Sequence, residues 1–100
     1  MRTKIHSYLG FAKRSRNLVT GYNTCVVTIH HKKAKLLILA EDLSENTLKK
    51  MKSLADSSGT PYRVYGTLQE LSQITGSQDR GIFAITDANF AKVILKEIDN

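Results

Sequence analysis

The chain has 100 residues, of which 41% are hydrophobic, with one proline and one cysteine. This composition excludes a disordered chain, and we expect residues 1–100 to form a single domain. The lone cysteine, Cys25, excludes an intramolecular disulfide, and no apolar run reaches the 18 residues of a membrane span. We therefore expect a soluble, cytoplasmic protein that makes no membrane contact.

The charge is unevenly distributed along the chain. Residues 1–52 carry 11 Lys/Arg and 3 Asp/Glu (11 − 3 = +8), whereas residues 53–100 carry 4 and 6 (4 − 6 = −2). A basic half and a mildly acidic half favour a protein with one face toward a polyanion. A solvated lysine-rich surface is the alternative explanation of the same numbers.

The first predicted element is an amphipathic helix over residues 2–14. Its apolar positions recur at spacings of three and four, as in a helix with one buried stripe. Lys13, Arg14 and Arg16 crowd its C-terminal end. Cations there are also favoured by the helix dipole, so this cluster has a structural as well as a functional explanation.

A second helix is predicted to begin at Thr20 as N-cap. Its expected buried stripe consists of Tyr22, Cys25, Val26 and Ile29. Cys25 is thus expected to be a small core residue and not a nucleophile. Val27 lies off this stripe and should be exposed.

The remaining elements alternate between strands and helices. Strands are predicted over 36–40, 62–65 and 81–86, and helices begin at Ser44, at the Thr67–Glu70 capping box and at Asp87. Gly76 should end the helix that the box opens. Such alternation predicts an α/β fold with helices on both faces of a mixed sheet.

Candidate catalytic groups are few. His30 and His31 are consecutive, so on a helix they point about 100° apart and cannot share a metal. Glu41 and Asp42 end a buried strand but point to opposite faces, and we expect Asp42 to accept hydrogen bonds from backbone N–H groups near Ser44. No glycine-rich phosphate loop occurs. We expect no catalysis, no cofactor and no metal.

Three segments carry a resemblance to a known family. They are Gly-Phe-Ala-Lys-Arg-Ser-Arg-Asn-Leu-Val-Thr-Gly at 10–21 with Asn23 after it, Lys-Ala-Lys-Leu-Leu-Ile-Leu-Ala-Glu-Asp at 33–42, and Pro-Tyr at 61–62 before a capped helix. This order resembles the kink-turn RNA-binding ribosomal proteins of the large-subunit seven-Ae and thirty-e type, most closely their small bacterial YlxQ-like branch. The resemblance covers roughly residues 5–96.

The resemblance implies a three-layer α/β/α sandwich with a mixed four-stranded sheet that grips kinked RNA at the start of the second helix. The family pattern there is Gly-x-Asn-Glu-x-x-Lys; Gly21 and Asn23 match it, while Thr24 and Val27 replace the acid and the lysine. A second family contact, just before the last strand, falls here on polar residues 77–79. The implied RNA-binding residues, with the basic residues expected to flank them, are Gly21, Tyr22, Asn23, Thr24, Val27, Lys13, Arg14, Arg16, Lys32, Lys33, Lys35, Ser77 and Gln78.

The function that the resemblance implies is non-catalytic RNA binding, associated with the ribosome or translation. The expected partner is structured RNA, ribosomal RNA in particular. The alternative is a protein-interaction module on the same scaffold, with Val27, Tyr22 and the neighbouring histidines as its contact patch. We expect a monomer, and a weak homodimer or a ribosomal-protein partner stays open.

Overall fold

Helices and strands alternate along the chain, as the hydrophobic pattern predicts from residue 36 onward. The computed structural model describes residues 3–76 and 80–100. Its helices there are α1 (Thr3–Arg14), α2 (Tyr22–His30), α3 (Glu45–Ser58), α4 (Leu68–Thr75) and α5 (Ala88–Asp99). Its strands there are β1 (Leu18–Thr20), β2 (Leu36–Leu39), β3 (Tyr62–Val64) and β4 (Ile82–Ile85).

The strands form one mixed sheet in the order β1-β4-β2-β3. Strand β4 is antiparallel to both β1 and β2, and β2 is parallel to β3. The register sets Ile85 between Leu18 and Leu36. Every residue of β2 and β4 is buried, which explains their unbroken apolar sequences. The predicted mixed four-stranded sheet is confirmed.

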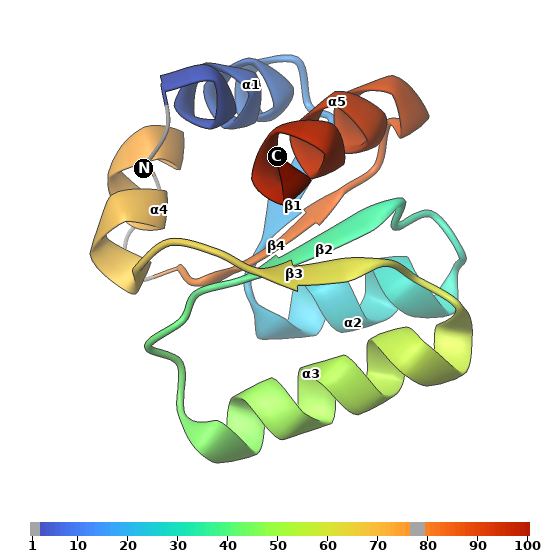
Figure 1. Ribbon diagram of the computed structural model, residues 1–100. Coiled ribbons are helices and arrows are strands. Elements are labelled where there is room, and N and C mark those ends of the chain that lie inside the picture. The colour runs from blue at the N-terminus through green and yellow to red at the C-terminus, as the bar shows by residue number, and fades with distance from the viewer. Residues whose placement is uncertain (1–2, 77–79) are drawn as a thin grey trace.

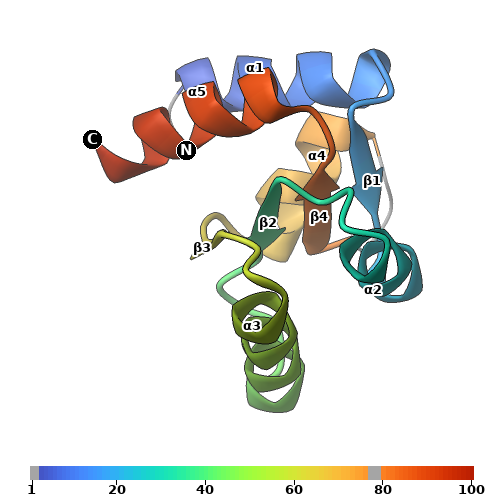
Figure 2. The same ribbon diagram turned by 90° about the vertical axis from the view of Figure 1, so that its right-hand side faces the viewer.

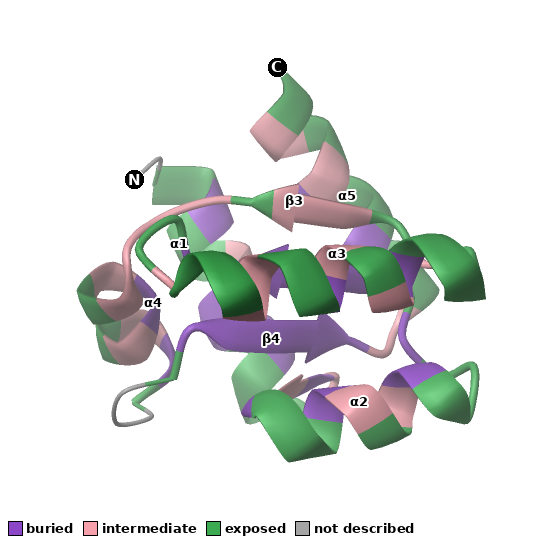
Figure 3. Ribbon diagram, turned by 90° about the horizontal axis from the view of Figure 1, so that it is seen from below, coloured by how far each residue is buried: buried purple, intermediate pink, exposed green. Residues whose placement is uncertain are grey.

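Helices cover both faces of this sheet (Figure 1). Helices α1, α4 and α5 pack on one face around a core that includes Leu9, Phe83 and Ile94. Helices α2 and α3 cover the other face around Cys25 and Met51. In Figure 3 the outer sides of α2 and α3 are exposed, whereas β4 beneath them is buried. The predicted three-layer α/β/α sandwich is confirmed.

Side chains cap three of the helices where the sequence predicts it. The Ser44 and Asp87 side chains accept the N–H groups of Thr47 and Phe90 at 3.2 and 2.9 Å. Thr67 and Glu70 form a reciprocal capping box, and the Thr67 N–H donated to the Glu70 carboxylate lowers its pKa.

Asp42 orders a loop, but not the one predicted. Its carboxylate accepts the Leu68 N–H at 2.8 Å, at the start of α4, and not an N–H near Ser44. The bend after β2 brings Asp42 beside α4, and this tertiary contact is absent from the local sequence pattern. Asp42 therefore adds a second carboxylate, beside Glu70, to the α4 start.

Two predictions about the start of α2 are wrong. Thr20 is the last residue of β1 and not the N-cap, which is Gly21. Tyr22 is not part of the buried stripe, since 42% of it is exposed, whereas Cys25 and Ile29 are buried as predicted. The cause is β1, a three-residue strand too short to give a periodic signal, which holds Thr20 in the sheet.

No helix in residues 3–76 and 80–100 is long and apolar enough to cross a membrane. Over the same ranges no group of three His, Cys, Asp or Glu side chains is placed to hold a metal ion.

Candidate nucleic-acid interface

Gly21 joins β1 to α2 in a backbone conformation that favours glycine. Its φ of 97° and ψ of 153° lie in a region that residues with a Cβ rarely adopt. The Gly21 N–H donates to the Ile82 carbonyl at 2.9 Å, and the Gly21 carbonyl accepts the Cys25 N–H at 3.0 Å. This glycine therefore fastens the start of α2 to the start of β4.

The start of α2 carries no side-chain cap. The backbone N–H groups of Tyr22, Asn23 and Thr24 belong to the first turn, where an α-helix provides no carbonyl partner. All three residues are exposed. Because these N–H groups and the positive end of the helix dipole face outward, the start of α2 suits a phosphate or another anion.

Arg80 supplies a positive charge at this place, and the sequence analysis missed it. Its guanidinium carbon lies 3.3 Å from the position that a Cβ on Gly21 would take. Ser72 holds the Arg80 backbone, because its hydroxyl donates to the Arg80 carbonyl at 3.2 Å and accepts the Arg80 N–H at 3.0 Å. The signal was available, since Arg80 directly follows the loop in which the family resemblance predicts a second contact.

Asn23 and Val27 are four residues apart and so lie on one side of α2. Val27 is 53% exposed, as predicted. Within residues 3–76 and 80–100 the Asn23 amide has no hydrogen-bond partner. Tyr22 lies about 140° around the helix from Val27, so the two do not form one continuous patch.

The predicted basic residues do not flank the start of α2. Lys35 donates its N–H to Ile85, and Asn17, next to Arg16, accepts the Thr86 N–H, so both adjoin the end of β4. Gly21 adjoins its beginning. Helix α2 runs along β4 from its beginning toward its end. Lys32 and Lys33, which follow α2, therefore lie at the same far end as Lys35. The end of α1 with the turn after it and the segment between α2 and β2 lie at this far end (Figure 2). These segments contain Lys13, Arg14, Arg16, Lys32, Lys33 and Lys35.

Ser77 and Gln78, the predicted loop residues, lie outside the described residues. The loop that holds them connects α4 to Arg80. Their contribution to the site stays a prediction.

Cys25 lies beneath the start of α2 and is a core residue, as predicted. Its side chain is fully buried, and its thiol donates to the Ile82 carbonyl at 3.5 Å. Burial raises the pKa of the Cys25 thiol to about 12, against smaller opposing effects of a hydrogen bond with Ala84 and the charge of Arg80. The thiol is therefore protonated at neutral pH and is not a nucleophile.

These features define a small α/β/α sandwich domain with an exposed, uncapped helix start beside an arginine. The chain belongs to the Ribosomal protein L7Ae/L30e/S12e/Gadd45 family, whose model matches residues 3–95. The family that the sequence resemblance indicated is therefore confirmed.

Relatives agree with this assignment. The chain is 33% identical over 91 residues to the RNA-binding protein YlxQ of Bacillus subtilis (strain 168), which covers 91% of each chain. It is 35% identical to the RNA-binding protein YlxQ of Enterococcus faecium, covering 91% of this chain and 87% of the relative.

Solved structures show the same fold. A protein of unknown function from Bacillus halodurans C superposes with a TM-score of 0.94 at 31% identity, covering 99% of this chain and all of the other. The Giardia lamblia 15.5kD RNA binding protein superposes with a TM-score of 0.82 at 15% identity, covering 99% and 91%. The fold is thus maintained at very low sequence identity.

Proposed function

We propose that this protein binds structured RNA without catalysing a reaction on it, and that the start of α2 recognises a kinked RNA of the ribosome or of another translation component. The observation that carries the proposal is the uncapped helix start at Gly21 with Arg80 beside it. Family membership and the RNA-binding proteins named YlxQ support it.

A phosphate of the RNA would meet the backbone N–H groups of Tyr22, Asn23 and Thr24. Gly21 has no side chain, so the Arg80 guanidinium can lie directly over it, beside the N–H groups that would meet the phosphate. The Arg80 guanidinium offers donors in a fork that matches two phosphate oxygens. Phosphate contacts of this kind contribute affinity that depends on salt, and they do not distinguish one sequence from another.

The Asn23 amide supplies the specific contact. Asn23 is exposed and its amide has both donors and an acceptor for the edges of bases that a kink splays out. Thr24 offers one hydroxyl where the family pattern has an acid, and Val27 offers no charge where it has a lysine. We infer that Arg80 replaces part of the positive charge that Val27 does not provide.

Asparagine substitutions test this site with an internal control. Asn23 and Asn46 are each the second residue of an exposed helix start, but α3 has the Ser44 cap. We expect Asn23→Ala to reduce the preference for a kink-turn RNA over a straight duplex of equal length about tenfold, the effect of one lost base contact. Asn46→Ala should leave it unchanged. Equal effects of both substitutions would contradict the proposed site.

A protein-interaction module is the alternative, and the 53% exposed Val27 favours it. In that case Val27 would contact another protein together with His30 and His31, which are exposed near it at the end of α2. Gel filtration with light scattering tests self-association: a dimer that Val27→Asp converts to a monomer would support the alternative. A wild-type monomer would exclude self-association through Val27.

A further inference from the structure

The far end of the sheet gathers most of the positive charge of the first 40 residues. Residues 1–40 contain no Asp or Glu and eight Lys/Arg. Six of these eight are exposed and lie in the last turn of α1, in the turn after it or between α2 and β2, and we call them the basic end. They are Lys13, Arg14, Arg16, Lys32, Lys33 and Lys35. The Arg14 guanidinium lies over the Phe11 ring, back along α1.

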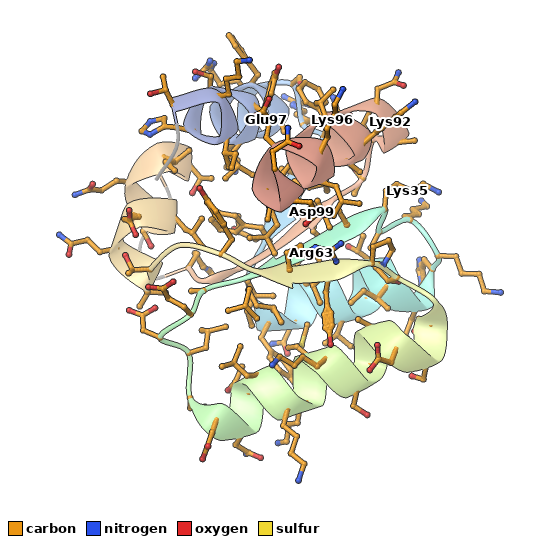
Figure 4. All side chains as sticks on the ribbon, viewed as in Figure 1. Lys35, Arg63, Lys92, Lys96, Glu97 and Asp99 are labelled. Carbon is orange, nitrogen blue, oxygen red and sulfur yellow. The ribbon has the colours of Figure 1, made fainter. Side chains whose placement is uncertain are left out.

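Three different connections meet at the basic end (Figure 2). The turn after α1 is tied to β4 by the Thr86 N–H, which donates to Asn17 at 2.9 Å. The segment before β2 is tied to β4 by the Lys35 N–H, which donates to Ile85 at 2.7 Å. Since these two segments lie on either side of β4, they are about 10 Å apart, twice the strand spacing. Helix α5 begins at the same end and brings Lys92, which lies on the side of Lys35 in Figure 4.

Among the described residues, no ion pair joins a carboxylate to the basic end. In residues 3–76 and 80–100 the ion pairs join Lys4 to Glu97 and Arg63 to Asp99, outside the basic end. The nearby Asp87 carboxylate accepts the Phe90 N–H. Clustered like charges repel one another in the compact state, so this surface gains from a polyanion.

Two of the six cations occupy backbone positions that favour glycine. Beyond each of α1 and α2, the second residue after the helix is left-handed: Arg16 with φ 63° and Lys32 with φ 57°. A pair of backbone hydrogen bonds closes each of these helix ends. At the ends of α3 and α4 the left-handed residue is glycine, Gly59 and Gly76.

A glycine or asparagine would fit these two positions with less strain, so the charges at 16 and 32 are present at a conformational cost. The helix dipole favours Lys13 and Arg14 in the last turn of α1. It also favours Lys32 and Lys33, whose N–H groups cap the end of α2, but not Lys35, because its effect decays within one turn. The dipole therefore accounts for only part of the cluster.

The basic end is also too far from the start of α2 to assist it electrostatically. The nine residues of α2 span about 13 Å at 1.5 Å each. Charges are screened over about 8 Å at physiological ionic strength. A phosphate bound at Gly21 therefore gains little from Lys32 or Lys33.

We infer that the basic end is a second RNA-binding surface, which takes the phosphate backbone of an RNA helix without reading its sequence. This inference rests on the proposed function, because it takes RNA to be the polyanion that binds the basic end. The helix can be another part of the RNA bound at α2 or a second RNA molecule. With both surfaces filled, the protein bridges two RNA segments across its sheet.

Matched lysine triplets test the surface. We expect Lys32→Gln with Lys33→Gln and Lys35→Gln to lower the salt slope of binding to a straight duplex by about three units, one for each lost contact. The same change at Lys49, Lys50 and Lys52 of α3 removes equal charge elsewhere and should have little effect. Equal effects of the two triplets would overturn the inference.

A second variant distinguishes a loss of RNA binding from a loss of folding. Arg16→Asn with Lys32→Asn relieves two left-handed positions, so we expect the thermal midpoint to rise while duplex binding weakens. A rise in stability with unchanged duplex binding would overturn the inference.

A capture experiment distinguishes the two sources of RNA. A short kink-turn RNA is immobilised and saturated with protein, and a labelled straight duplex is added. If the labelled duplex is captured, and the triple substitution of Lys32, Lys33 and Lys35 abolishes this capture, the basic end binds a second RNA molecule. An affinity gain on lengthening the arms of the kinked RNA, lost in the triplet, indicates one continuous RNA. If neither occurs, bridging is wrong. If the proposed kink recognition at the start of α2 is wrong and the basic end still binds RNA, the straight duplex should bind directly with an unchanged salt slope.

Discussion

The two ends of the β-sheet differ in how they can hold a phosphate. The start of α2 offers fixed geometry: oriented N–H groups, a glycine without a side chain and the Arg80 guanidinium. The basic end offers six exposed cations on turns and a helix end. Fixed donors suit one RNA shape, whereas exposed charges attract any RNA helix. The same fold can therefore separate specificity from charge-driven affinity.

The largest expected effect is that of Gly21→Ala. We expect it to lower the free energy of unfolding by about 1–3 kcal/mol, because alanine is strained at φ 97°, ψ 153°. The new Cβ would also displace the Arg80 guanidinium, so kink-turn binding should weaken by at least the loss of that one contact. Denaturant unfolding and RNA titration measure the two effects.

Gly59→Ala controls for backbone strain. Gly59 is also left-handed, with φ 67°, but nothing lies within 4 Å of its missing Cβ. We expect a stability loss of about 1 kcal/mol with unchanged RNA binding. If Gly59→Ala weakens RNA binding as much as Gly21→Ala does, strain rather than the site would explain the loss.

Arg80→Gln should have the next largest effect. It removes one charge beside Gly21 while the Ser72 hydrogen bonds to the Arg80 backbone remain available. We expect the salt slope of kink-turn RNA binding to fall by about one unit, with little change in stability. Lys50→Gln on α3 is the matched control, and an equal loss with both would refute a local role for Arg80.

Thr67→Ala sharpens the contrast between a capped and an uncapped helix start. Loss of the Thr67 hydroxyl, which accepts the Glu70 N–H at 3.1 Å, should cost about 1 kcal/mol of stability. RNA binding should not change, because N–H groups at the start of α4 already donate to side chains of the protein itself. Denaturant unfolding checks the first effect and RNA titration the second. A large loss of RNA affinity would place α4 in the interface.

The smallest effect concerns Cys25. Because burial raises its pKa from 9.0 to about 12, the folded thiol should react with iodoacetamide at pH 8 far more slowly than the unfolded one. The neutral thiol is favoured in the folded state, so its contribution to stability is complete below pH 9 and is lost as the pH rises toward 12. Mass spectrometry of the alkylated protein follows the rate, and equally fast reaction in both states would contradict burial.

Much of the fold could be predicted because it is encoded locally. The apolar runs of β2 and β4 indicate buried strands, and Ser44, Thr67 and Asp87 indicate helix starts through their own side chains. Strand β1 could not be located in this way, since three residues give no period. Because β1 is not predicted, the sequence places the N-cap at Thr20 in place of Gly21 and predicts that Tyr22 is buried.

The candidate site was less predictable because it is assembled from distant segments. Gly21 and Asn23 are implied by the family resemblance, and the exposure of Val27 follows from the helical spacing of α2. Arg80 reaches Gly21 only through the pairing of β1 with β4. The basic residues were assigned to the same site because they are close in sequence, but the return of α2 along the sheet carries Lys32 and Lys33 to the opposite end.

The most direct measurement is a titration of the protein with a fluorescent kink-turn RNA and with a straight duplex of equal length, each at low and at physiological salt. A site at the start of α2 predicts preferential binding of the kinked RNA at physiological salt, while duplex binding weakens steeply as salt rises. Equal binding of both RNAs at every salt concentration would contradict the account.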